Sequence, residues 1–247
     1  MSLNNILGKQ GKASPLQEEH WIPLSDLMTG LMMFMLIAII FMVKVESDAV
    51  KVESDAKKVK DIALIYDEMR AQLYQDLHSE FEKNLPDWGA DLDRDLTFRF
   101  KEPSVLFDTG KDSLKPRFIQ ILNEFFPRYV RIMGADRYRN SIEEIRIEGH
   151  TSSMWNGSVN SNEAYFFNMA LSQSRTRSAL QYVLTLPQVQ EQQPWLKAHL
   201  TANGLSSSKI IYHADGTENK DGSQRVEFRV RTNADARISE ILKTAQQ

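Results

Sequence analysis

The stretch WIPLSDLMTGLMMFMLIAIIFMVKV, residues 21–45, decides how this chain is organised. Its central part, residues 27–43, runs for 17 residues without a charged side chain, and only Thr29 and Gly30 interrupt the apolar sequence. With its flanks, the stretch is long enough for a helix to cross a hydrocarbon core roughly 30 Å thick. Trp21 stands where interfacial tryptophans are found. We therefore predict a single transmembrane helix over residues 21–45, with an unusual carboxylate, Asp26, near its start.

The composition limits how much of the 247-residue chain lies in a membrane. A hydrophobic content of 42%, a net charge of −3 and a negative mean hydropathy are typical of a globular protein with a small membrane part. The balance of charges gives no basic face, so we expect no nucleic-acid partner. The absence of cysteine excludes disulfides and thiolate chemistry. The five histidines show no HxxxH or HExxH spacing, so we expect neither metal nor cofactor.

A cleaved signal peptide is the alternative interpretation of the apolar stretch. Against it, the run is long, and the charged sequence VKVESDA follows in place of an A-x-A-like cleavage site. The orientation of the helix does not follow from its flanking charges. More lysines follow the stretch than precede it, which favours a cytoplasmic C-terminus, but the later ones alternate with acids. These residues are Lys9 and Lys12 before the stretch, and Lys44, Lys51, Lys57, Lys58 and Lys60 after it.

A long helix is predicted to follow the apolar stretch. Residues 1–20 read as a polar tail, and VKVESDA at 43–49 is repeated at 50–56. Small apolar residues then alternate spacings of four and three, as in a coiled coil: Val45, Ala49, Val52, Ala56, Val59 and Ala63. We name these six residues the Val/Ala seam. An apolar stripe continues through Met69, Leu73, Leu77 and Phe81, and Pro86–Gly89 ends the helix. Residues 46–90 are thus predicted to pair two copies of the chain, the alternative being a solvated linker.

From about Leu92 the sequence alternates between strand-like and helix-like segments. The predicted strands are LTFRF (96–100), IEEIRIEG (142–149), LTANG (200–204) and RVEFRVR (225–231). Residues 115–133 are predicted to form a helix that Pro127 ends or kinks. Residues 163–185 are predicted to form a second helix whose apolar face carries Phe167, Leu171, Leu180 and Leu184. The fold class is therefore α+β, with a helix-covered sheet over residues 91–235 and a helical tail over 236–247.

Four motifs in the second half stand in the order typical of a known domain. They are VLFDTGKDSLKP (105–116), IRIEGHTSS (145–153), NMALSQSR (168–175) and ENKDGSQRVEFRV (218–230). The set resembles OmpA-like peptidoglycan-binding domains over roughly residues 95–232, and it is specific because several spaced motifs agree.

The first half resembles a second part of the same protein class. Trp21, followed five residues later by Asp26 and then by LMTGLMMFML, is similar to the membrane helix of MotB-type stator subunits. Those proteins join one such helix to an OmpA-like periplasmic domain. The short N-terminal tail and long helix look most like the corresponding subunits of Zorya anti-phage defence systems, although the residues do not separate a defence motor from a flagellar stator. The resemblance implies a bacterial inner-membrane homodimer with a cytoplasmic N-terminus, a periplasmic C-terminal domain, and a polytopic ring partner of the MotA, ExbB or ZorA kind.

Asp26 has two interpretations. Ser25 and Asp26 are suited to cap a helix start, where the helix dipole favours a carboxylate. The resemblance instead implies that Asp26 carries an ion, of which we favour H⁺ over Na⁺, inside a protein-lined path. Ser25 and Thr29 are near enough in sequence to support that path by hydrogen bonding. The methionines at 28, 32, 33 and 35 would then contact the ring partner, plain lipid exposure being their alternative.

The resemblance also implies a peptidoglycan site. Arg175 stands where the family's NxxLSxxR helix holds the peptide carboxylate, with Asn168 and Leu171 also in place. The planar guanidinium can meet a carboxylate with two parallel bonds. The family's acid after Gly-His-Thr is Ser152 here, which departs from the diaminopimelate-binding pattern, and Asp108 in the FDTG loop is a candidate substitute. An ordinary surface role is the alternative for Arg175, and we expect structural roles for His150 and Arg225.

These observations predict an ion-conducting, wall-anchored subunit of a MotB-type motor. The alternative is a passive tether, in which Asp26 only caps a helix. No GxSxG motif, phosphate loop or paired-carboxylate motif is present, so we expect no enzymatic activity.

Overall fold

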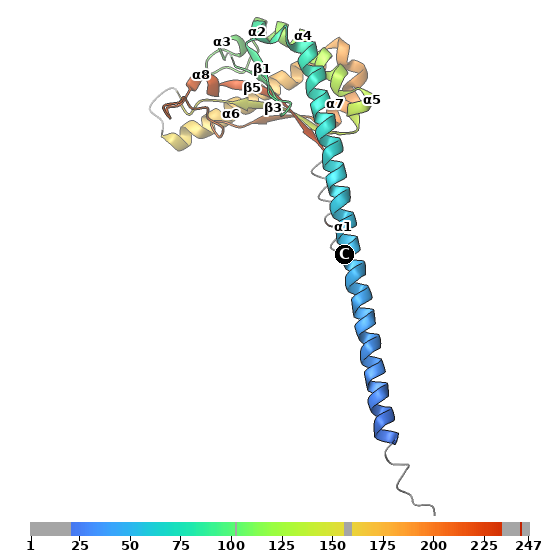
Figure 1. The fold of residues 1–247 in the computed structure, drawn as a ribbon. Helices are drawn as coiled ribbons and strands as arrows, with labels where there is room; N and C mark the ends of the chain where they lie inside the picture. The colour runs from blue at the N-terminus through green and yellow to red at the C-terminus, as the bar shows by residue number, and fades with distance from the viewer. Residues whose placement is uncertain (1–20, 102, 156–159, 234–242, 244–247) are drawn as a thin grey trace, which may run out of the picture. The chain divides into compact units, whose positions relative to one another are not determined.

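The computed structural model describes residues 21–101, 103–155, 160–233 and 243. The chain divides into two compact units, residues 1–57 and 58–247. Helix α1 (Trp21–Phe81) begins in the first unit and ends in the second (Figure 1). Within the described residues, α1 is the one helix long and apolar enough to cross a membrane, and none of its most apolar window is buried by the chain. The predicted helical tail, residues 236–247, lies outside the described residues apart from Lys243.

The second unit is built on a five-stranded sheet in the order β1-β2-β5-β3-β4. The strands are β1 (Ala90–Leu92), β2 (Phe98–Phe100), β3 (Ile142–His150), β4 (Leu200–Gly204) and β5 (Arg225–Thr232). Only β3 and β4 are parallel, and α6 (Ser161–Thr185) connects them, as a parallel pair requires. The remaining pairs are antiparallel. Each of the four predicted strands is present, and the α+β fold class is confirmed.

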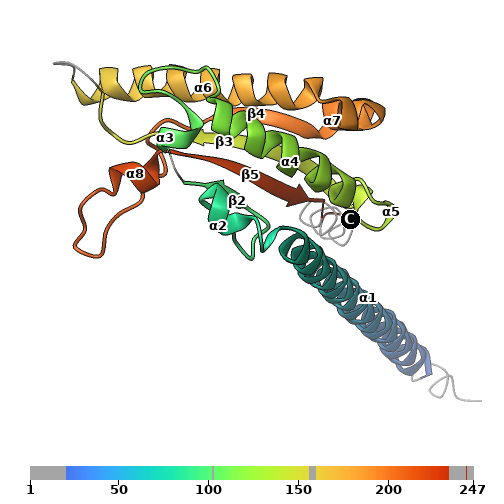
Figure 2. The same ribbon diagram turned by 90° about the horizontal axis from the view of Figure 1, so that it is seen from above.

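The two faces of the sheet differ in polarity. Side chains alternate along each strand, so that Phe98, Ile147 and Phe228 lie in the hydrophobic core. Their neighbours Arg99, Glu148 and Glu227 lie on the opposite face. Helices α4 (Pro116–Met133) and α6 cover the apolar face (Figure 2). Short helices join the larger elements: α2 (Leu85–Trp88), α3 (Pro103–Leu106), α5 (Asp136–Arg139), η1 (Pro187–Gln192), α7 (Gln193–His199) and α8 (Lys220–Ser223).

Helix α6 buries a different face from the one predicted. Phe167 is 46% exposed, and the three predicted leucines are only half-buried. The buried residues are small or polar instead: Ala164, Asn168, Ser172, Arg175, Thr176, Ala179 and Val183. Two strand glycines explain this choice, since a Cβ at Gly204 would lie 2.3 Å from the Gln173 nitrogen and one at Gly149 would lie 2.7 Å from Thr176. The helix lies so close to the sheet that large side chains do not fit between them.

The last turns of α1 belong to the core of the second unit. Leu73, Leu77 and Phe81 have no exposed surface, and the Phe81 ring packs against Trp88, Phe98 and Phe125 at centroid distances of 5.2–5.9 Å. The helix ends at Phe81, and α2 then ends at Gly89, which has the left-handed conformation (φ 58°) that glycine adopts readily. The stripe that continues the Val/Ala seam is therefore buried within its own chain.

Helix α4 does not end at Pro127. It continues to Met133, with Phe125, Phe126, Tyr129 and Val130 all buried around the proline. The predicted helix over residues 115–133 is confirmed, and of the two effects expected of Pro127, an end or a kink, the end does not occur. Tertiary packing on both sides of the proline outweighs one missing backbone hydrogen bond.

Candidate functional site

Asp26 lies within helix α1 rather than at its start. The described helix begins at Trp21, so Ser25 and Asp26 already have helical neighbours on both sides, and the capping interpretation is wrong. The Thr29 hydroxyl donates to the Ser25 carbonyl oxygen (2.8 Å), the usual bond of a helical threonine to the preceding turn. Neither Ser25 nor Thr29 is hydrogen-bonded to the Asp26 carboxylate in the single chain.

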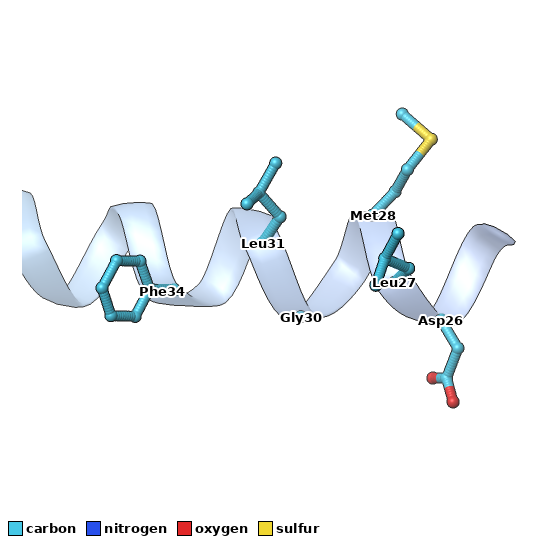
Figure 3. A pocket seen from close by; sticks show the side chains of 6 residues that line it. All are labelled: Asp26, Leu27, Met28, Gly30, Leu31 and Phe34. Atoms are coloured by element: carbon cyan, nitrogen blue, oxygen red, sulfur yellow. The ribbon is translucent and has the colours of Figure 1, made fainter. Parts of the chain in front are cut away.

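The surroundings of Asp26 are apolar and open. Figure 3 shows the Asp26 carboxylate projecting away from Met28 and Leu31, with Gly30 one turn further along. Apart from the backbone of the helix and the two neighbouring residues, no atom of the described residues lies within 4 Å of the place where a Gly30 side chain would begin, so this part of the helix surface is open to another group. The neighbouring apolar side chains are largely exposed, from 55% for Leu36 to 72% for Leu27. A helix that is apolar on all sides is stable only within lipid or protein.

The second unit contains a cavity of about 350 Å³ at the end of β3. Several elements contribute to its lining: the loop before α4, the residues after β3, one side of α6, and α8. The lining residues are Thr109, Gly110, Thr151, Ser152, Met154, Trp155, Asn168, Leu171, Arg175, Lys220, Asp221 and Gln224. The cavity thus brings together Arg175, Asn168, Leu171 and Ser152, four of the five residues predicted for the peptidoglycan site.

Arg175 is held rigidly at the base of this cavity. It is only 8% exposed, its Nε donates to the Lys111 carbonyl (2.9 Å), and its Nη2 donates to the Asp108 carbonyl (3.0 Å). The guanidinium also lies over the Phe107 ring, 4.9 Å from its centroid. Burial lowers the pKa of Arg175, and the Asp112 carboxylate acts in the opposite direction. The surface-residue interpretation is therefore wrong for Arg175, which is a buried cation oriented by two backbone carbonyls.

Asn168 fixes the segment that follows β3. Its side-chain amide donates to the carbonyls of Ser152 (3.2 Å) and Met154 (3.1 Å). Ser172, one turn further along α6, accepts a hydrogen bond from the Ser206 nitrogen (3.1 Å) and so fixes the segment after β4. The polar face of α6 thereby holds the loops after β3 and β4 against the helix at this end of the sheet.

Asp108 does not present its carboxylate to the cavity. The carboxylate is paired with Lys115 (3.2 Å) and Lys111 (3.5 Å), and only the Asp108 carbonyl reaches Arg175. The hydrogen bond from Lys115 is the main reason why the pKa of Asp108 is lowered. The lining residues that sequence reasoning missed include Lys220, Asp221 and Gln224, which come from α8 and from its C-cap before β5. Their position directly before RVEFRV was the available signal.

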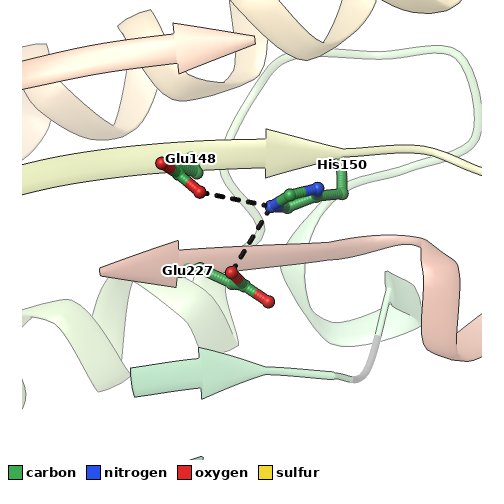
Figure 4. Close-up of side chains that lie close together, drawn as sticks. All are labelled: Glu148, His150 and Glu227. Atoms are coloured by element: carbon green, nitrogen blue, oxygen red, sulfur yellow. Dashed lines mark ion pairs between the residues drawn. The ribbon is translucent and has the colours of Figure 1, made fainter. Parts of the chain in front are cut away.

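A second polar cluster lies on the opposite face of the sheet. The His150 ring stands between two buried carboxylates, with Nε2 3.5 Å from Glu227 and 3.8 Å from Glu148 (Figure 4). Arg99 and Arg225 also donate to Glu227 at 2.8 and 2.7 Å. Burial acts to raise the pKa of Glu227, but His150 and the two guanidinium groups outweigh it and hold this pKa well below its ordinary value.

This cluster has the donor atoms of a metal site but the electrostatics of a structural ion-pair network. The ligand atoms of Glu148, His150 and Glu227 lie within 4.8 Å of one another. Each carboxylate, however, also faces guanidinium groups: Arg99 and Arg225 at Glu227, and Arg146 and Arg229 within 3.9 Å of Glu148. A cation would have to compete with these four positive charges. We therefore assign the cluster a structural role, in which its ion pairs hold strands β2, β3 and β5 together.

The chain thus combines an apolar N-terminal helix that bears Asp26 with a five-stranded α+β unit that holds the Arg175 cavity. No family model matches the sequence. The Zorya protein ZorB of Escherichia coli is 44% identical over 245 residues, which cover 98% of this chain and 100% of that protein. The chain therefore belongs to the ZorB family.

Two solved structures resemble part of the chain. A MotB-like protein from Desulfovibrio vulgaris is 23% identical, with a TM-score of 0.48, over 66% of this chain and 91% of that chain. The periplasmic domain of Helicobacter pylori MotB is 16% identical, with a TM-score of 0.43, over 63% of this chain and 97% of that chain.

Proposed function

We propose that this chain is the ion-carrying, wall-anchored subunit of a Zorya-type anti-phage membrane motor. The observation that carries the proposal is Asp26, the one charged side chain between residues 21 and 43, on a helix whose apolar surface the chain leaves uncovered. An ionisable group inside a membrane helix is costly and is found where an ion or substrate passes. We take the ion to be H⁺.

The ion path requires other chains. A lone helix leaves Asp26 exposed, whereas a carboxylate within a membrane needs a protein-lined or water-filled cavity. We assign this role to a ring of polytopic ZorA-like subunits around two copies of α1. The free surface next to Gly30 gives such a ring close access to the carboxylate. Protonation would remove the charge and ionisation would restore it, so that packing around Asp26 alternates between two states.

The energy available to this switch follows from the membrane potential. Moving one elementary charge across about 100 mV releases roughly 2.3 kcal/mol. Passage of ions through Asp26 would thereby turn the ring relative to the anchored subunits. We place the N-terminus in the cytoplasm and the OmpA-like domain in the periplasm of the inner membrane, where the Arg175 cavity can reach peptidoglycan.

Two copies of the chain would pair through the Val/Ala seam. Its first residues are exposed, with Val45 at 51% and Val52 at 68%. Small side chains at heptad spacing allow two helices to approach closely. The apolar stripe from Leu73 to Phe81 cannot contribute to this pairing, because it is buried in the core of the second unit.

The test of the proposal is phage protection by cells that express Asp26→Asn together with the partner subunits. We expect loss of protection with unchanged membrane levels and unchanged co-purification of the ring subunit. The matched control is Asp48→Asn, which makes the same chemical change at an exposed position beyond the apolar stretch. Full protection by Asp26→Asn at normal expression would refute ion carriage and leave a passive tether.

A further inference from the structure

The carboxylate of Asp221 is unpaired at the edge of the Arg175 cavity. Asp221 lines this cavity, and within the described residues its carboxylate has neither a hydrogen bond nor an ion pair. Most other acids of the second unit are paired, as Asp108 is with two lysines. Asp221 is thus the one negative side chain among the cavity's lining residues, which include two positive ones, Arg175 and Lys220.

A well-ordered turn presents this carboxylate. Asp221 lies in α8, and the Asn219 side chain accepts a hydrogen bond from the Gly222 nitrogen at its start (2.8 Å). The Ser223 hydroxyl accepts from the Ile211 nitrogen (2.9 Å), and the Gln224 nitrogen donates to the Asp221 carbonyl (3.2 Å). Strand β5 follows directly. The backbone of Asp221 is therefore fixed relative to the sheet.

The charges of the cavity fit a ligand that carries both signs. Arg175 offers a planar cation whose Nε and Nη2 are already oriented by carbonyls, which leaves the remaining nitrogen for a carboxylate. An ammonium group on the same ligand needs an acid within the cavity. Ser152 cannot supply a charge, and the Asp108 carboxylate points to lysines outside the lining. Only Asp221 meets this requirement among the lining residues.

We propose that Asp221 receives the ammonium group, and Arg175 the carboxylate, of a diamino-acid residue in a cell-wall peptide. This inference rests on the proposed wall binding and assigns the amine-recognising residue. Asp221 takes the place of the acid that Ser152 lacks, from a different element of the fold. The amine contact is a charge-assisted hydrogen bond, which is typically about twice as strong as a neutral one.

The test is binding of a muropeptide to the full chain in detergent. The probe is the tripeptide N-acetyl-L-Ala-γ-D-Glu-meso-diaminopimelate, used with the side-chain amine of its diaminopimelate free and after acetylation of that amine. We expect Asp221→Asn to weaken binding of the free-amine probe about tenfold or more. Acetylation should weaken binding to the wild-type chain by a similar factor, and it should have little further effect on Asp221→Asn.

Matched variants complete the design. Asp136→Asn removes the same charge from α5, at the other end of the sheet (Figure 2), and should bind as the wild type does. Ser152→Asp should restore much of the binding that Asp221→Asn loses. If the wild type binds the probe and Asp221→Asn binds equally well, the assignment of Asp221 is overturned while wall binding stands. If the wild type binds neither the probe nor isolated peptidoglycan sacculi, wall binding itself is overturned, and the Asp221 inference with it.

Discussion

Two parts of helix α1 differ in what surrounds them. In residues 27–43 almost every side chain is apolar and more than half exposed. In residues 66–81 charged residues surround a narrow stripe of Tyr66, Leu73, Leu77 and Phe81, and the second unit buries that stripe. An all-apolar helix must find lipid or protein outside its own chain, whereas a one-sided helix can be satisfied by its own domain. The exposed part is therefore where partner and membrane contacts are expected.

The comparison also limits where two copies can pair. Ion pairs reinforce the attachment of the buried stripe, because Arg128 and Arg131 both donate to Glu80 (2.7 and 2.9 Å), and Tyr138 donates to Asp76. A helix attached in this way is not available for a coiled coil on the same face. The Val/Ala seam before it is free of such contacts over residues 45–52.

The largest expected difference is all-or-none and concerns cross-linking between copies. The chain has no cysteine, so each introduced thiol is unique. We expect Val52→Cys to form disulfide-linked dimers in oxidised membranes, because the seam places equivalent positions opposite each other. Ser79→Cys, exposed on the attached part of α1, should remain monomeric. Gel analysis without reductant gives the answer, and efficient cross-linking at Ser79 alone would reverse the assignment of the pairing region.

The next effect is on stability. Phe81→Ala should lower the free energy of unfolding of the second unit by about 3–5 kcal/mol, because it leaves a cavity among Trp88, Phe98 and Phe125. The matched change in the other region, Phe34→Ala, should have an effect below about 0.5 kcal/mol, since that ring is 71% exposed. Denaturant unfolding of the full chain in detergent measures both. Equal effects would show that the two parts of α1 are not as different as their exposure indicates.

Low pH should also affect the two regions differently, lowering the stability of the second unit but not the helicity of the apolar helix. The pKa of Glu227 is lower in the folded chain than in the unfolded one, so its contribution is present above about pH 4.3 and is lost as the pH falls toward the folded-state value. We expect Glu227→Gln to reduce the stability of the second unit at pH 7 by about 2 kcal/mol and to flatten its acid dependence. The apolar helix should stay helical in detergent over the same range, as followed by circular dichroism. An unchanged acid dependence in Glu227→Gln would exclude this carboxylate as the cause.

The smallest effect concerns the ion pairs that attach the helix. Glu80→Gln should lower the stability of the second unit by about 1 kcal/mol, because Arg128 and Arg131 keep a hydrogen-bond acceptor but lose its charge. Glu46→Gln, the same change at an exposed position of the first unit, should have no measurable effect. Thermal unfolding in low and high salt distinguishes the two, and a salt-insensitive loss at Glu80 would contradict an electrostatic cause.

The sequence predicted the elements of the fold better than their contacts. Alternating polarity located the strands at 96–100 and 225–231, because one face of the sheet is apolar and the other is charged. The buried face of α6 could not be predicted from apolar spacing, since close packing against Gly149 and Gly204 selects small and polar residues. What buries the stripe ending at Phe81 could not be predicted either, because the same spacing suits packing against a second helix or against the chain's own sheet. The domain boundaries remain predictions.

The candidate site was also predicted only in part. Local motifs identified Arg175, Asn168, Leu171 and Ser152, which the fold brings to one cavity. Asp221 lies in the motif at 218–230, to which no binding role was assigned, and it comes to the cavity from α8, directly before β5 pairs with β3. The choice of Asp108 as substitute acid did not anticipate its pairing with Lys115. Contacts between distant segments thus decide which acid is available to a ligand.

The most direct test of the central claim is proton flux through the reconstituted complex. The chain would be co-purified with its ring partner, placed in liposomes with a pH-sensitive dye inside, and exposed to an imposed proton gradient and membrane potential. Ion carriage by Asp26 predicts flux through the wild-type complex and none above empty liposomes through Asp26→Asn, at equal amounts of complex. Equal flux through both complexes would contradict it.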